Sequence, residues 1–109
     1  MDVQVTQLAA LEPLIARLKE HYQPLQIWLF GSRARGAARA DSDWDVAAVL
    51  PDEARSELFD PSTVWRLLHQ DEFGADVVVF AKSEFDEDRS TPNTIPFVIA
   101  REGILLDER

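Results

Sequence analysis

The segment FGSRARG at residues 30–36, followed by DWD at residues 43–45, decides how the rest of the sequence is interpreted. One apolar run, residues 27–30, ends at the first glycine, and a second, residues 46–50, begins directly after Asp45. Side chains two apart on a strand point to the same side, so Asp43 and Asp45 are expected to project together. Two neighbouring carboxylates are costly unless a cation lies between them, whereas a glycine lets the backbone approach a phosphate closely. The pattern therefore predicts a phosphate site beside a divalent-metal site.

The spacing of the Gly-Ser pair at 31–32 and the Asp-x-Asp motif at 43–45 resembles the signature of the nucleotidyltransferase (DNA polymerase β-like) superfamily. The longer string GSRARGAARADSDWDVAAVL, residues 31–50, is similar to that of its smallest members, the minimal nucleotidyltransferases of the MNT or MntA antitoxin type. The resemblance covers nearly the whole chain. It implies an α/β fold with a short, twisted, mixed sheet flanked by helices, formed by a single domain, residues 1–109.

Three carboxylates are the candidate catalytic and metal-binding groups: Asp43, Asp45 and Asp76. Asp76 opens the third apolar run as Asp45 opens the second, and the alternative for each is an exposed acid at the start of a strand. The resemblance implies that Asp76 helps to deprotonate the acceptor hydroxyl and completes a second metal site. Oxygen-only ligands and a triphosphate substrate favour Mg²⁺ as the cofactor. The resemblance implies that the substrate is ATP.

Four residues of the glycine-rich segment are candidates for binding the nucleotide: Gly31, Ser32, Arg33 and Arg35. The resemblance implies that Gly31 and Ser32 hold the β- and γ-phosphates, although the same pair could form a plain strand-to-helix turn. One of the two arginines could steady the triphosphate or the leaving pyrophosphate, or both could face solvent.

Composition limits the kinds of partner that this chain can have. The 109 residues carry a formal charge of −9, which disfavours broad nucleic-acid binding because acidic surfaces repel phosphates. There is no apolar run long enough for a membrane span, no signal peptide and no cysteine, so a cytoplasmic location is expected. A domain of this size has no spare element with which to hold a large acceptor.

The resemblance also implies a partner protein and a reaction. Minimal nucleotidyltransferases pair with a HEPN-domain toxin and transfer AMP from ATP to one of its tyrosines, which makes the nucleotidyltransferase the antitoxin. Two alternatives remain open: a non-catalytic antitoxin that masks the toxin, and the catalytic subunit of a small-molecule nucleotidyltransferase of the aminoglycoside type.

Hydrophobic periodicity and breaker residues predict an alternation of helices and short strands. The charged segment 82–89 is expected to be a solvated loop, and the sheet is expected to be covered mainly on one face. Trp44, between the two aspartates, is expected to point the opposite way, into the core. The predicted helices are 12–22, 32–38, 60–70 and 94–102, with a helical turn at 52–58, and the predicted strands are 25–30, 45–50, 76–80 and 104–106.

Overall fold

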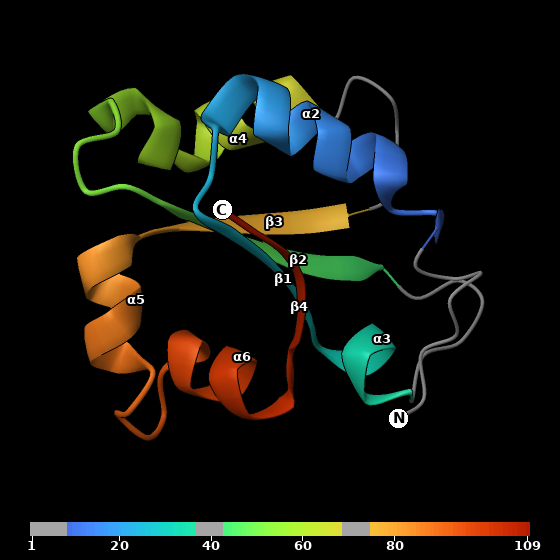
Figure 1. Ribbon diagram of the computed structural model, residues 1–109, viewed down its shortest axis with the longest axis vertical. Helices are drawn as coiled ribbons and strands as arrows, with labels where there is room; N and C mark the ends of the chain where they lie inside the picture. The colour runs from blue at the N-terminus through green and yellow to red at the C-terminus, as the bar shows by residue number, and fades with distance from the viewer. Residues whose placement is uncertain (1–8, 37–42, 69–74) are drawn as a thin grey trace.

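A four-stranded mixed sheet forms the centre of the protein, for which the computed structural model describes residues 9–36, 43–68 and 75–109 (Figure 1). The strand order is β3-β2-β1-β4, with β1 antiparallel to both β2 and β4, and β2 parallel to β3. The strands are β1 (Gln26–Phe30), β2 (Trp44–Leu50), β3 (Ala75–Ala81) and β4 (Ile104–Glu108). All four predicted strands are confirmed, and β4 extends beyond its predicted end.

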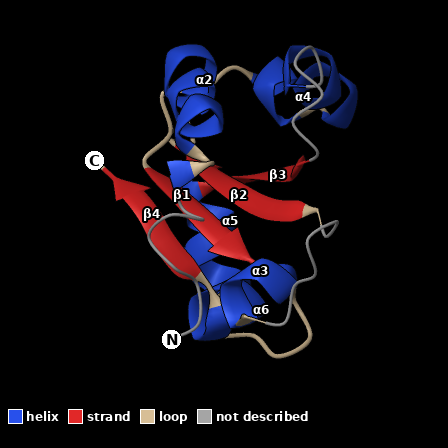
Figure 2. Ribbon diagram, turned by 90° about the vertical axis from the view of Figure 1, so that its right-hand side faces the viewer, coloured by secondary structure: helices blue, strands red, loops and turns tan. Residues whose placement is uncertain are grey.

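Helices cover the sheet in two layers, which are clearest when the molecule is viewed along the sheet (Figure 2). One layer contains α2 (Glu12–Tyr22), the 3₁₀ turn η1 (Ser56–Phe59) and α4 (Pro61–Leu68). The other side of the sheet carries α3 (Ser32–Arg35), α5 (Lys82–Asp88) and α6 (Ile95–Glu102). No helix in the described ranges combines the length and the apolar character that a membrane-spanning helix needs.

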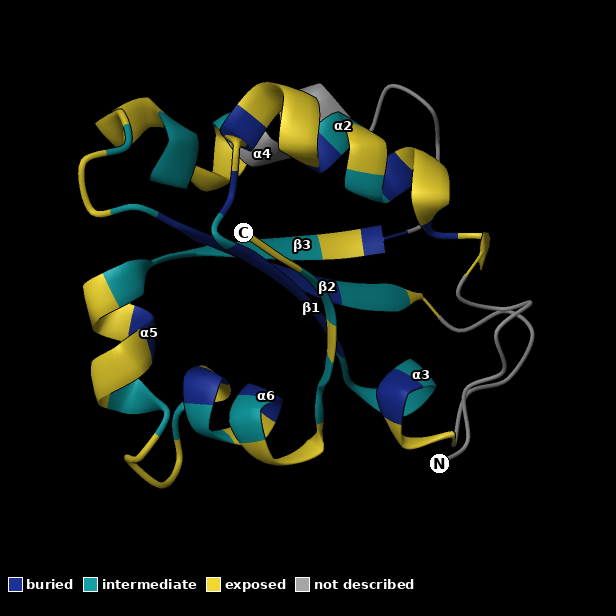
Figure 3. Cartoon of the chain, in the orientation of Figure 1, coloured by how far each residue is buried: buried dark blue, intermediate teal, exposed yellow. Residues whose placement is uncertain are grey.

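The predicted coverage of mainly one sheet face is wrong, because β2 is buried from both sides (Figure 3). Val46, Ala48 and Leu50 belong to an apolar cluster with the α2 layer. Ala47 and Val49 alternate with them and belong to a second cluster on the opposite face. The near-continuous apolar character of β1 and β2, typical of strands covered on both faces, is the sequence signal of this arrangement.

Segment 82–89, predicted to be a solvated loop, instead contains α5, and one apolar side chain explains the difference. Phe85 is fully buried, with its ring centroid 6.0 Å from that of Trp28 and 5.9 Å from that of Phe80. The first turn of α5 is held by Asp52, whose Oδ1 accepts a hydrogen bond of 2.9 Å from the Ser83 N–H. This bond lowers the pKa of Asp52 below its ordinary value. Because only one of the seven residues of α5 is buried, the segment has no repeating apolar pattern from which a helix could be predicted.

Candidate functional site

The predicted site residues lie at one end of the sheet, where β1 ends and β2 and β3 begin. Phe30, the last residue of β1, pairs with Asp45 across the antiparallel ladder. Asp45 in turn pairs with Asp76 across the parallel ladder between β2 and β3. Because adjacent strands lie about 4.8 Å apart, this register places the two carboxylates side by side and Gly31 directly beyond the pair. The sheet thus brings together residues that are far apart in the sequence.

Gly31 is the point at which the chain turns from β1 into α3, and the structure allows no side chain there. Its φ of 77° and ψ of −158° belong to a region that only glycine adopts without strain. A Cβ atom built on Gly31 would overlap Oδ2 of Asp45, so the backbone lies directly against that carboxylate. The Gly31 carbonyl then accepts from the N–H groups of Ala34 and Arg35, at 3.1 and 3.2 Å, which forms the turn of α3.

The α3 helix is shorter than predicted and leads away from the site within one turn. It begins at Ser32, which is partly buried, and ends at Arg35. Gly36 terminates it in the left-handed conformation, with φ of 74°, and its N–H donates to the Ser32 carbonyl. The remainder of the predicted helix, residues 37 and 38, lies outside the described residues, as do residues 39–42.

Negative charge is concentrated around Asp45. Partial burial raises the pKa of its carboxyl above the ordinary value, and the charges of Asp76 and Asp43 raise that pKa further, while Arg35 opposes them. Asp43 and Asp76 are themselves exposed at the starts of their strands. Asp43 and Asp76 are therefore close enough for their charges to act on Asp45.

The chemistry of this donor set fits a hard divalent cation. Mg²⁺ is held in proteins by one or two carboxylates, and phosphate oxygens and water complete its shell. In the described ranges, no group of three His, Cys, Asp or Glu side chains converges closely enough to chelate a single ion. Asp45 and its neighbours therefore resemble an open site that a phosphate would complete, rather than a closed protein cage.

The two arginines of the glycine-rich segment lie in different surroundings. Arg33 places its guanidinium 4.3 Å from the ring centroid of Trp44. Arg35 is exposed, and its charge acts on Asp45. Trp44 points away from the aspartates, as predicted, and packs against the α2-side cluster. Its side chain is only partly buried, whereas the prediction placed it in the core. The contact between Arg33 and Trp44 was missed from sequence, because no local spacing rule joins positions that are eleven apart.

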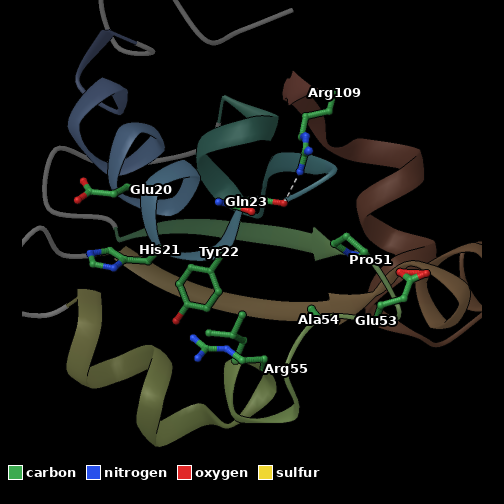
Figure 4. A pocket seen from close by; sticks show the side chains of 10 residues that line it. Glu20, His21, Tyr22, Gln23, Pro51, Glu53, Ala54, Arg55 and Arg109 are labelled. Carbon is green, nitrogen blue, oxygen red and sulfur yellow. Dashed lines mark hydrogen bonds between the residues drawn. The ribbon is translucent and has the colours of Figure 1, made fainter.

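A separate pocket of about 590 Å³ lies at the other end of the sheet, beyond the end of β2 (Figure 4). The Tyr22 side chain is buried beside it, and within the described residues its hydroxyl has no hydrogen-bond partner. None of the predicted site residues contributes to this pocket. It is lined by Glu20, His21, Tyr22, Gln23, Pro51, Glu53, Ala54, Arg55, Leu58 and Arg109.

Comparison with known proteins identifies the class to which the fold and site belong. Residues 12–109 match the family described as polymerase beta, nucleotidyltransferase, and the chain belongs to this family. No curated protein sequence matches it significantly.

Solved structures with the same fold include a nucleotidyltransferase from Sulfolobus solfataricus, with a TM-score of 0.61, 19% identity, and coverage of 96% of this chain and 83% of that one. A toxin–antitoxin complex with AMP-PNP has a TM-score of 0.57 and 19% identity, over 88% and 71% of the two chains. The third is an MntA–HpeT toxin–antitoxin complex in which two aspartates, two positions apart, are replaced by glutamate. Its TM-score is 0.56, at 17% identity over 89% and 72% of the two chains.

The contact between Gly31 and Asp45 can be tested with a double-mutant cycle. Gly31→Ala should destabilise the fold through backbone strain, which costs about 1–3 kcal/mol, and through overlap with the carboxylate. In an Asp45→Ala background the overlap with the carboxylate is removed, and the strain remains together with a close approach to the Cβ of residue 45, so the two changes should couple by about 1 kcal/mol or more. Urea unfolding in EDTA gives both values. Gly36→Ala is the control, because its cost should be the same in either background; an equal cost of Gly31→Ala in both would refute the contact.

Proposed function

We propose that this chain transfers AMP from Mg-ATP to a hydroxyl group of a partner protein, a tyrosine of a HEPN-domain toxin, and thereby acts as an antitoxin of the type VII-like class. The observation that carries the proposal is the position of Asp45, in register with Asp76 and in contact with the Gly31 turn. Membership of the nucleotidyltransferase family supports the reaction class. The two replaced aspartates of the MntA–HpeT complex have the same spacing as Asp43 and Asp45, which supports the assignment of this pair.

The proposed reaction is a substitution at the α-phosphorus of ATP. The acceptor oxygen forms a bond to that phosphorus, the bond to the β-phosphate oxygen breaks, and pyrophosphate leaves. Asp43 and Asp45 would hold Mg²⁺, with Asp76 completing a second site, and the metal would neutralise phosphate charge and favour the ionised acceptor. Asp76, exposed on the neighbouring strand in register with Asp45, would take the proton from the acceptor hydroxyl.

The glycine-rich turn would position the triphosphate. Without a side chain at Gly31, a phosphate can approach the backbone, and the hydroxyl and N–H of Ser32 follow at the start of α3. Arg35 is the better candidate for the triphosphate or the leaving pyrophosphate, because its charge acts at the carboxylates. Arg33, stacked on Trp44, is the better candidate for fixing the turn.

The proposed acceptor is a protein because the described elements leave little with which to hold a free one. The strands form the sheet, and the helices lie on its two sides (Figures 1 and 2). Two structural neighbours are toxin–antitoxin complexes, one of them with AMP-PNP, which supports a protein partner and an adenine nucleotide. In-line transfer needs a positioned acceptor oxygen, and a docked protein surface can supply that positioning.

Intact-mass measurement of the partner tests the reaction. Incubated with this chain and Mg-ATP, the proposed HEPN-domain partner should gain mass in whole AMP units. Asp43→Asn should abolish the gain because a charged metal ligand is lost, while Glu12→Gln, an exposed change on α2, should leave it intact. A partner that stays unmodified, yet is still neutralised by the Asp43 variant, would favour the masking antitoxin. Transfer to an aminoglycoside instead would favour the small-molecule enzyme.

The different surroundings of the two arginines predict different defects. Arg35→Ala should lower kcat/KM for ATP by about tenfold or more, because a charge-assisted contact to phosphate is lost. Arg33→Ala should instead lower stability by about 0.5–1 kcal/mol through the lost contact with Trp44. Steady-state kinetics and thermal unfolding on both variants make the comparison. The assignment fails if Arg33→Ala is the more damaging to kcat/KM at equal stability.

A further inference from the structure

Among the described residues, one buried hydroxyl has no partner, and it lies beside the pocket beyond the end of β2. Tyr22, the last residue of α2, is only 3% exposed, and its hydroxyl oxygen is closed off from solvent without a hydrogen bond. Such a group costs free energy in a folded protein, and a phenylalanine would fill the same space without that cost. The unpaired hydroxyl therefore calls for an explanation, and a bound ligand is one.

The wall of the pocket beside Tyr22 is apolar. The Tyr22 ring belongs to the apolar cluster on the α2 side of the sheet, and Ala54 and Leu58 pack against that cluster from the segment after β2. Pro51, the residue that follows β2, also lines the pocket. The volume of about 590 Å³ lies within the range of small-molecule sites, about 300–1,000 Å³. The pocket can thus bury the apolar body of a small ligand.

Two hydrogen-bond donors converge at this wall, since the Tyr22 hydroxyl and the Arg55 guanidinium point toward one another (Figure 4). Burial raises the pKa of Tyr22 above its ordinary value, so the hydroxyl keeps its proton at neutral pH. Arg55 pairs with Glu57 at 3.2 Å, but the two side chains are 76% and 60% exposed, and such a pair is weak. The exposed guanidinium can therefore turn to admit an anion to the hydroxyl.

The other charges of the lining favour an anion that carries a single charge. The pocket is lined by two acids, Glu20 and Glu53, whose carboxylates point away from the hydroxyl toward opposite sides of the view (Figure 4). Arg109 is already engaged, because its Nη1 donates to the Gln23 carbonyl at 2.7 Å. A multiply charged phosphate would thus meet one available guanidinium, that of Arg55, beside two acids.

We propose that this pocket binds a small amphiphilic carboxylic acid, whose carboxylate accepts from the Tyr22 hydroxyl and pairs with Arg55 while its apolar body lies against Ala54 and Leu58. A carboxylate matches the planar fork of a guanidinium and can accept from a hydroxyl at the same time. The inference goes beyond the proposed function and does not depend on it, because none of the candidate catalytic residues lines this pocket.

NMR titration with two acids tests the site in the absence of nucleotide and partner. Benzoate, which is aromatic, and isovalerate, which is aliphatic, are the probes. At least one of them should shift the amide signals of Ala54 and Leu58 to saturation and leave that of Gly31 unchanged. Benzyl alcohol, which lacks the charge, and inorganic phosphate, which lacks the apolar body, should bind at least about tenfold more weakly.

Three variants identify the groups that hold the carboxylate. Tyr22→Phe and Arg55→Ala should each weaken binding of the tighter acid by about tenfold, because each removes one donor. The control is Arg101→Ala on α6, an exposed arginine outside the pocket, which should leave the affinity within about twofold. Without ligand, the thermal midpoint of Tyr22→Phe should be unchanged or higher, because the fold loses no hydrogen bond.

The site is overturned if neither acid gives a saturable shift at Ala54, or if benzyl alcohol binds as tightly as benzoate. Unchanged affinity in Tyr22→Phe or in Arg55→Ala would also overturn it, and a shift centred on Gly31 would place the acid at the candidate catalytic site instead. A lower thermal midpoint of unliganded Tyr22→Phe would mean that the hydroxyl already has a partner within the fold, which removes the reason for a ligand.

Discussion

The contact between the Asp45 carboxylate and the backbone of Gly31 is the constraint on which the site depends. It exists because the antiparallel register of β1 and β2 places Phe30 opposite Asp45, and the next residue must then turn away. Only glycine accepts both the backbone angles and the close approach. The parallel pairing of β2 with β3 adds Asp76 at the same level, so one register fixes the Gly31 turn and two carboxylates together.

Along β2, the candidate binding residues lie at the start of the strand and the residues that stabilise the fold lie further along it. On β2, the residues after Asp45 are fully buried between two apolar clusters, whereas the residues at its start are partly exposed. The buried part of the strand holds carboxylates that repel one another, and partial burial of Asp45, together with the charges of Asp76 and Asp43, raises its pKa. Repulsion between carboxylates at the start of the strand costs free energy, and apolar packing further along the strand offsets that cost. A site for a cation and an anion requires such an arrangement of charges.

Much of the fold and the grouping of the candidate site could be predicted from sequence because both depend on local patterns. The Gly-Ser pair and the Asp-x-Asp motif each adjoin an apolar run, so their positions at strand ends follow from burial alone. The helix at Lys82–Asp88 could not be predicted, because it depends on the burial of Phe85 and on a hydrogen bond from the Ser83 N–H to Asp52, which is far away in the sequence. The two-sided covering of the sheet was also missed, although the near-continuous apolar character of β1 and β2 is typical of it, because the packing of α5 and α6 against the second face is a tertiary property.

The different environments of Arg33 and Arg35 also needed the structure, because the stacking on Trp44 joins residues across residues 37–42. Sequence left the two arginines equivalent, as neighbours of the same charge on the same turn. The structure separates them by what lies opposite: an aromatic ring for Arg33 and a carboxylate for Arg35. That distinction is the basis of the different roles proposed for the two arginines.

The central claim is that the metal and the nucleotide bind where β1 ends and β2 begins, and not in the pocket at the far end of the sheet. Paramagnetic NMR with Mn²⁺ in place of Mg²⁺, together with a non-hydrolysable ATP analogue, tests it directly. The account predicts strong broadening of the amide signals of Gly31, Asp45 and Asp76, lost in Asp45→Asn, with Ala54 and Arg109 unaffected. Broadening at Ala54 and Arg109, or broadening at Gly31 that persists in the Asp45 variant, would contradict it.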